Sequence, residues 1–279
     1  MTEENTNAEA TLPADDSGAS ASANGAAQNA AQATQTTPSS QPNWSAYRKA
    51  EVAKVRYDAP AEVSIKSLMG AGCHFGHQTK RWNPQMSPYI YGVRNDVHIL
   101  NLDLTMQRWK LARQAIVDCT SRGGKVLFVG TKKQAQDIIA EEAVRSESFY
   151  VSSRWLGGTL TNFSTIKRSV ERMKKLEELL AKAADPDSDI RLAKKEQISI
   201  ARDLGRLEEN IGGIKDLKTA PDLVFVVDVR KESIAIAEAR KLHIPVIALV
   251  DTNASPKQLD YIFHQMMMQL RQYVFLLEQ

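Results

Sequence analysis

Runs of consecutive apolar residues, each followed by a helical segment, restrict the fold of this chain more than any other feature. The runs occur at 125–130, 149–151, 223–227 and 245–250. They lack the alternation of polar and apolar residues that marks a strand with one face in water, so both faces of each strand should be buried. The pattern predicts an α/β fold with a doubly wound parallel sheet, flavodoxin- or Rossmann-like, with helices on both faces.

The remaining segments of this part extend the alternation. A short helix is expected at 63–71, a strand beginning at His98, and helices at 104–116, 134–144 and 232–242. We expect this α/β domain to comprise residues 44–161 and 214–253.

Residues 162–213 depart from this rhythm because they contain no strand pattern. Two helical stretches, divided near 185–188, each carry apolar residues at steps of three and four: Ile166, Val170, Met173, Leu176 and Leu180, then Ile200, Leu204, Leu207 and Ile211. Near-heptad spacing on both predicts a protruding antiparallel coiled-coil hairpin, begun by a cap at Thr161 or Asn162 and ended at Gly212. The outer faces of the hairpin carry mixed charge, which favours a solvated surface over an RNA-binding arm. A hairpin that binds protein partners is an alternative.

The two ends differ from the centre. Residues 1–43 are rich in Ala, Ser and Gln, with too few large apolar groups to offset the entropy of ordering, so we expect a disordered tail. In residues 254–279, helical spacing of Ile262, Met266 and Leu270 predicts a C-terminal amphipathic helix. No apolar run of ~18 residues predicts a membrane span, and two cysteines fit a reducing compartment, so we expect a cytoplasmic protein.

The net charge of +3 conceals an asymmetry along the chain. Residues 1–44 contain five acidic residues and no Lys or Arg, which leaves 36 basic against 28 acidic residues, a balance of +8, in the rest. An excess of this kind favours polyanionic partners through counterion release.

Two segments suggest binding chemistry. Cys73, His74 and His77 have metal-ligand side chains, but no second ligand pair follows, so we expect no metal site. Gly130–Lys133 joins an apolar strand to a helix, where amides and two lysines could clamp a phosphate. It matches neither nucleotide-loop pattern, which favours a contact to an RNA backbone, with an ordinary turn as the alternative.

Acidic residues at two strand ends raise the possibility of an enzyme. Asp228 and Asp251 lie where ligand crevices of open α/β sheets form, and with Lys231 and Glu232 could act on a sugar-phosphate or metal. No catalytic triad order and no cofactor fingerprint accompanies them, so helix capping is the more economical interpretation, and we expect no catalytic residue and no cofactor.

Two loops, 78–84 and 153–162, place Arg beside Trp among Gly, Pro and Asn. Arginine pairs with phosphate and tryptophan offers a stacking plane, the combination that structured RNA contacts use. Core packing of Trp82 and Trp155 is the alternative, since tryptophan is highly buried on average.

Several long strings together resemble the bacterial small-subunit ribosomal protein S-two family. They are AGCHFGHQTKRWNP at 71–84, PYIYGVRNDVHI at 88–99, FVGTKKQA at 128–135, RWLGGTLTNF at 154–163, PDLVFVVD at 221–228 and IPVIALVDTN at 244–253. The resemblance runs from about Val63 to Asn253, and the segment after it diverges.

The resemblance implies a structural, non-enzymatic constituent of the small (30S) subunit on the cytoplasmic ribosome. It implies binding to 16S rRNA near the head–body junction, contact with other small-subunit proteins and help in anchoring ribosomal protein S-one, with no membrane and no small-molecule substrate. By the same resemblance, the residues expected to contact RNA are Lys80, Arg81, Trp82, Arg94, Lys132, Lys133, Arg154 and Trp155.

Overall fold

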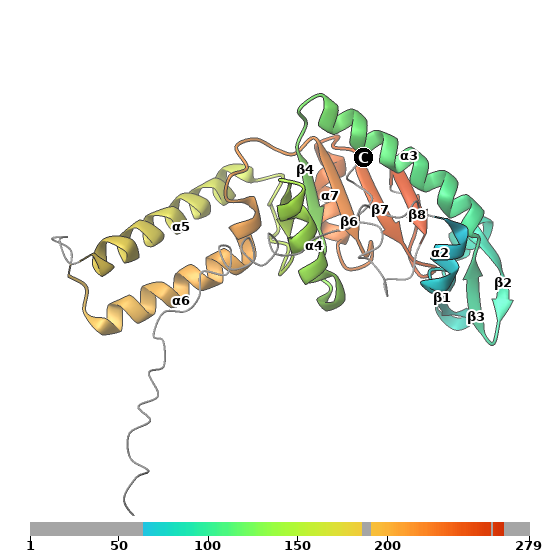
Figure 1. Ribbon diagram of the computed structural model, residues 1–279, viewed down its shortest axis with the longest axis horizontal. Coiled ribbons are helices and arrows are strands. Elements are labelled where there is room, and N and C mark those ends of the chain that lie inside the picture. The colour runs from blue at the N-terminus through green and yellow to red at the C-terminus, as the bar shows by residue number, and fades with distance from the viewer. Residues whose placement is uncertain (1–63, 186–190, 258, 265–279) are drawn as a thin grey trace, which may run out of the picture. The chain divides into compact units, whose positions relative to one another are not determined.

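The computed structural model describes residues 64–185, 191–257 and 259–264, which form two sheets flanked by helices (Figure 1). The elements in chain order are α2 (Ile65–Gly70), β1 (Phe75–Gln78), η1 (Thr79–Arg81), η2 (Pro84–Tyr89), β2 (Ile90–Arg94), β3 (Val97–Leu100), α3 (Leu102–Ser121), β4 (Val126–Val129), α4 (Lys133–Arg145), β5 (Phe149–Val151), α5 (Phe163–Ala184), α6 (Lys194–Ile211), η3 (Gly212–Ile214), β6 (Leu223–Val227), α7 (Ser233–Lys241), β7 (Val246–Val250) and β8 (Tyr261–His264).

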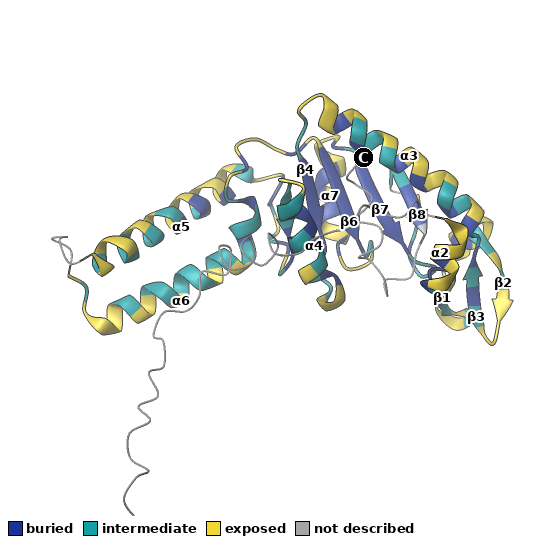
Figure 2. Ribbon diagram, in the orientation of Figure 1, coloured by how far each residue is buried: buried dark blue, intermediate teal, exposed yellow. Residues whose placement is uncertain are grey.

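The larger sheet has five strands in the order β5-β4-β6-β7-β8, and every neighbouring pair is parallel. The chain leaves β4 toward β5 and then returns to β6 on its other side, so the strand order reverses at β4, as in flavodoxin-like sheets. All residues of β4, β6 and β7 are buried, as Figure 2 shows by their dark blue strands. The α/β fold with a parallel sheet is confirmed.

Alternate residues of each strand pack on opposite faces of this sheet. On one face, Leu127 and Val129 belong to an apolar cluster with Ala235, Ile236 and Ala239 of α7. On the other, Val126 and Phe128 join a cluster built with α3 and α4. Helices therefore cover both faces, which explains why the strand sequences show no polar alternation.

The strand predicted at His98 forms, but in a different sheet. β3 is the middle strand of a three-stranded sheet, β1-β3-β2, and both of its pairings are antiparallel. The flanking strands β1 and β2 are short, contain glycine and include exposed positions, so their sequences resemble loops.

The helix predicted after residue 254 is wrong at Ile262, because Tyr261–His264 is strand β8. β8 pairs in parallel with β7 and buries Phe263 completely, so sheet pairing and burial outweigh the helical spacing of the apolar residues. The α/β sheet thus extends beyond residue 253. The predicted tail (1–43) and the rest of the predicted helix (265–279) lie outside the described residues.

The segment 162–213 is helical, as predicted, and α5 and α6 pack side by side (Figure 1). Asn162 occupies the position before α5, and α6 passes into η3 at Gly212. α5 buries Ile166, Val170 and Met173. No described helix is long and apolar enough to cross a membrane.

Candidate nucleic-acid interface

Two of the segments predicted to contact RNA follow the carboxyl ends of neighbouring strands. Lys132 and Lys133 come after β4, and Arg154 comes after β5. Because β4 and β5 are parallel, both segments leave the same edge of the sheet. Lys133 and Arg154 are exposed there, whereas Lys132 is half-buried.

A third segment reaches this edge from the smaller sheet. The backbone N–H of Asn83 donates to the carbonyl oxygen of Thr252, just beyond the carboxyl end of β7, at 2.8 Å. Lys80 and Arg81, exposed on η1, therefore lie in a loop held at the edge that also carries Lys132. The backbone N–H of Thr79 donates to the backbone carbonyl oxygen of Asp96 at 2.9 Å, which ties the same loop to the β2–β3 turn. Arg94, next to this turn, is exposed.

Trp82 has one side packed and one side open. Its ring lies against buried His98, with ring centroids 4.9 Å apart, yet 37% of the residue is exposed. Trp82 therefore packs against the protein in part, and contact of its exposed part with RNA stays a prediction.

The turn after β4 is already occupied by a carboxylate of the protein itself. Glu232, which is 2% exposed, accepts from the backbone N–H of Thr131 at 3.0 Å and from its hydroxyl at 2.5 Å. Lys132 Nζ lies 3.4 Å from Asp228 Oδ2. In the predicted phosphate clamp, the N–H and hydroxyl of Thr131 are therefore already bound to Glu232. Lys133 is more exposed than Lys132.

The loop 153–162 is folded around the carboxylate of Glu238 on α7. One oxygen, Oε1, accepts from Trp155 Nε1 at 3.1 Å and from the backbone N–H of Gly158 at 2.7 Å; the other accepts from the N–H groups of Leu160 and Thr161 at 3.0 and 3.1 Å. Burial alone would raise the pKa of Glu238, but these hydrogen bonds outweigh it and lower the pKa.

This arrangement corrects the expectation for Trp155. Its ring is 8% exposed and belongs to the core beside α7, so it has no open face for a nucleotide base. Trp155 supports the loop, and exposed Arg154 beside it remains available for contact.

A crevice at the carboxyl edge joins two strings that lie about 175 residues apart in the chain. The backbone N–H of His77 donates to Thr252 Oγ1 at 2.8 Å, and His77 Nδ1 lies 2.9 Å from Asp251 Oδ1. Gly76 permits the approach, because a Cβ there would lie 2.5 Å from Thr252 Cγ2. His77, Lys132, Asp228 and Asp251 help line a cavity of about 370 Å³.

The residues of the enzymatic alternative are engaged with other groups of the protein. Lys231 Nζ donates to the carbonyl oxygen of Thr131 at 2.6 Å, Glu232 is buried, and Asp228 and Asp251 pair with Lys132 and His77. In the part of the chain that the structure describes, no group of three or more His, Cys, Asp or Glu side chains could hold a metal ion.

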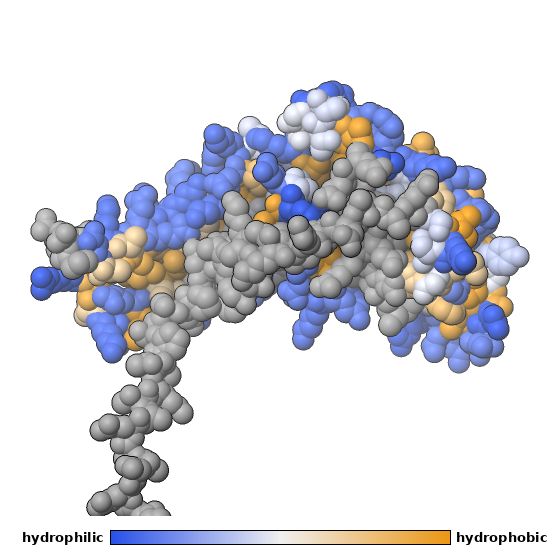
Figure 3. All heavy atoms as spheres, viewed as in Figure 1, coloured by the Kyte–Doolittle hydropathy of each residue, from blue (hydrophilic) through white to orange (hydrophobic). Residues whose placement is uncertain are grey.

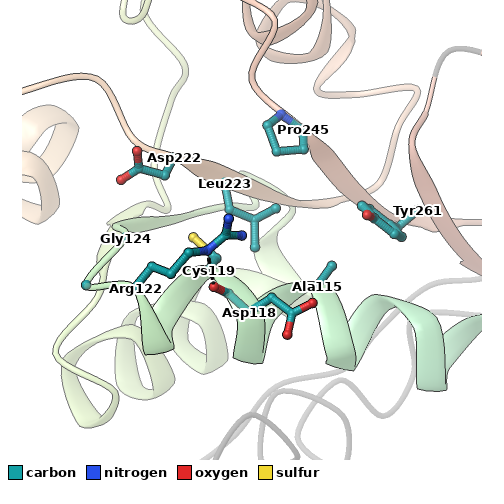
Figure 4. Close-up of a pocket in the computed structure, with 10 residues that line it drawn as sticks. Ala115, Asp118, Cys119, Arg122, Gly124, Asp222, Leu223, Pro245 and Tyr261 are labelled. Atoms are coloured by element: carbon teal, nitrogen blue, oxygen red, sulfur yellow. Dashed lines mark hydrogen bonds between the residues drawn. The ribbon is translucent and has the colours of Figure 1, made fainter.

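A second cavity, of about 490 Å³, lies at the opposite, amino edge of the sheet (Figure 4). Cys119, Arg122 and Asp222 help line it, and Arg122 Nε donates to the carbonyl oxygen of Asp118 at 2.7 Å. Burial, followed by the charge of Asp222, raises the pKa of the Cys119 thiol. None of the residues predicted to bind RNA lines this cavity.

Glu238 and Thr252 position these loops, although the sequence patterns did not indicate either residue. Thr252 has no local signal, and both residues act on partners more than 70 residues away. A weak signal exists for Glu238, because a carboxylate on an otherwise apolar helix face requires partners.

Comparison with known proteins agrees with the resemblance. The family model described as "Ribosomal protein S2" matches residues 68–268, so the match continues past Asn253, where we expected divergence. The protein named "Small ribosomal subunit protein uS2" from Desulfovibrio desulfuricans is 50% identical over 203 residues, which cover 72% of this chain and 77% of that protein. The protein of the same name from Brucella ovis is 50% identical over 200 residues, covering 72% and 77%. The ordered strings, the parallel sheet and these matches together place the chain in one family: it belongs to the ribosomal protein S2 family.

Proposed function

We propose that this chain is a structural, non-catalytic constituent of the small ribosomal subunit and binds 16S rRNA through the carboxyl edge of its parallel sheet. The relatives are named as small ribosomal subunit proteins, and membership of their family supports the same role on the cytoplasmic ribosome. The observation that carries the RNA proposal is the distribution of charge along this edge.

Four cations at the edge are exposed, whereas four acidic side chains there are paired, hydrogen-bonded or buried. Lys80, Arg81, Lys133 and Arg154 are all exposed. By contrast, the acidic side chains of the edge are engaged within the protein: Asp228, Glu232, Glu238 and Asp251. The charge left facing outward is positive, which favours phosphate contacts.

Sedimentation of the full chain with small subunits tests this proposal. We expect the tagged protein to migrate with small subunits on sucrose gradients, and to be released as the salt concentration rises, because phosphate contacts weaken with salt. Migration as free protein at low salt, or retention independent of salt, would contradict it.

Finer features are also proposed from the family. We infer that the protein lies near the head–body junction, contacts neighbouring small-subunit proteins and helps to anchor ribosomal protein S-one. We further propose that residues 162–213 form an antiparallel coiled-coil hairpin attached to an RNA-binding α/β domain. The burial of Val170 and Met173 on α5, and the contact of α5 with α6, support the hairpin.

Depletion tests the role in anchoring. Subunits made without this protein should lose S-one, and adding the protein back should restore it. Retention of S-one at the normal level in depleted subunits would exclude the anchoring role while leaving the rRNA proposal intact.

A further inference from the structure

The three-stranded sheet presents an outer face with exposed aromatic groups that the proposed contacts do not use. Phe75 pairs with Ile99 across β1 and β3, Gly92 pairs with Ile99 across β2 and β3, and Arg94 pairs with Val97. Cross-strand partners lie on the same side of a sheet. These five residues define the outer face, while His98, on the opposite side, is buried.

An irregularity in β2 accompanies the most exposed aromatic residue of this sheet. The register shifts between Ile90 and Gly92, which leaves Tyr91 without a cross-strand partner. Ile90 pairs with Leu100 on the buried side of the sheet, so alternation along the strand places the next residue, Tyr91, on the outer side. Tyr91 is 81% exposed and Phe75 is 44% exposed, and Figure 2 shows β2 as a largely exposed strand.

The backbone next to Tyr91 is open. A Cβ at Gly92 would meet no atom within 4 Å, so the backbone there is open. In Figure 3, apolar and hydrophilic atoms interleave over this end of the molecule, at the right of the view. A flat ring could therefore lie against the backbone at Gly92, beside Tyr91.

Charge around the face favours an anionic partner over a protein. Residues 64–101 contain the exposed cations Lys66, Lys80, Arg81 and Arg94 and one acidic residue, Asp96. A protein-binding patch is depleted of charge at its core and needs no such bias. Aromatic side chains on a sheet face with neighbouring cations are the arrangement that stacks unpaired RNA bases.

We propose that the outer face of the three-stranded sheet is a stacking platform on which Phe75 and Tyr91 hold unpaired rRNA bases while Arg94 contacts the adjoining phosphate. This inference rests on the proposed function and specifies it: the carboxyl edge binds backbone phosphate, and this face binds bases of a single-stranded segment.

Affinity measurements on single substitutions test the platform. Full-length protein is titrated into small subunits that lack it. Tyr91→Ala should weaken binding roughly five- to one-hundred-fold, the range for one stacked base, whereas Tyr91→Phe, which keeps the ring, should bind like the unmodified protein. Leu111→Ala, which removes another exposed apolar side chain, on α3 (55% exposed), is the control and should have no effect.

Ultraviolet cross-linking of reassembled subunits identifies the partner. We expect base adducts on the peptides containing Phe75 or Tyr91, and fewer adducts for Tyr91→Ala. Normal affinity for both Phe75→Ala and Tyr91→Ala would overturn the platform, and so would chemical cross-links from this face to a ribosomal protein. Unmodified protein that failed to bind the subunits would overturn the proposed function as well, so the two failures are distinguishable.

Discussion

The two Arg–Trp loops of this protein have similar sequences and opposite environments. In the loop 78–84, Trp82 rests against His98 and keeps 37% of its surface exposed. In the loop 153–162, Trp155 is 8% exposed and its indole N–H donates to Glu238. The first loop leaves part of its aromatic ring exposed, whereas the ring of the second loop is buried and supports the backbone beside Arg154.

The difference shows that a remote side chain decides what a tryptophan does. Glu238 supplies a buried acceptor for the indole and for three backbone N–H groups of the loop 153–162. The ring of Trp82, by contrast, lies against the ring of His98. Substitutions in the two loops should therefore separate stability from binding.

The largest effect is expected for Trp155→Ala. Removing a buried tryptophan leaves a cavity and costs about 3–5 kcal/mol of the free energy of unfolding. Denaturant titration should show this loss, while Trp82→Ala, the matched change in the other loop, should lose about 1 kcal/mol or less. Equal losses for the two variants would contradict the contrast between the loops.

A somewhat smaller effect is expected for Glu238→Gln. The amide nitrogen cannot accept, so buried N–H groups of the loop lose their partner, at a cost of about 2–3 kcal/mol. Hydrogen exchange at Gly158, Leu160 and Thr161 should accelerate in this variant more than exchange in β6. Unchanged protection of these three amides would show that Glu238 does not hold the loop.

Acid should reproduce part of this effect. Because the folded state lowers the pKa of Glu238, its stabilising contribution is present above the unfolded pKa of about 4.5 and is lost as the pH falls through the lower folded value. The difference in stability between the unmodified protein and Glu238→Gln should therefore narrow below pH 4.5. A constant difference down to strong acid would contradict the lowered pKa.

Trp82→Ala should weaken the binding of the protein to small subunits. If Trp82 stacks a base, the loss is about 1–3 kcal/mol of binding free energy, and Trp82→Phe should recover much of it. Circular dichroism of both variants serves as the control for folding. Full affinity of Trp82→Ala would show that Trp82 stacks on no base and serves only to pack against His98.

The smallest effect is expected for single lysines at the start of α4. Lys133→Ala should lower the slope of log affinity against log salt concentration by about one. Lys132→Ala should lower it less, because Lys132 already pairs with Asp228. Equal slopes for Lys133→Ala and the unmodified protein would show that Lys133 makes no phosphate contact.

Much of the fold follows from local patterns. Strands β4, β6 and β7 are fully buried, so their sequences are continuously apolar and predict their own environment. The antiparallel sheet was not predictable in this way, because β1 and β2 contain exposed residues and glycine and acquire strand geometry only by pairing with β3. β8 illustrates the same limit, since helical spacing was overridden by its parallel pairing with β7.

The candidate interface was predictable to a similar degree. The sequence indicates which loops are basic, and the parallel sheet then places Lys133 and Arg154 at one edge because carboxyl ends of parallel strands coincide. The sequence does not indicate that the N–H of Thr131 is already bound by Glu232, or that Trp155 is buried. The two partners, Glu232 just before α7 and Glu238 on α7, are distant in the chain.

By itself, the sequence determined the family, the parallel sheet and the helical segment 162–213, because these depend on composition, periodicity and long ordered strings. Only the tertiary structure decided which of two equivalent tryptophans is exposed, which acidic side chains are engaged within the protein and which face of the antiparallel sheet is open. The physical reason is that burial and charge pairing depend on neighbours brought together by folding, as Glu238 and Trp155 are across 83 positions of the chain.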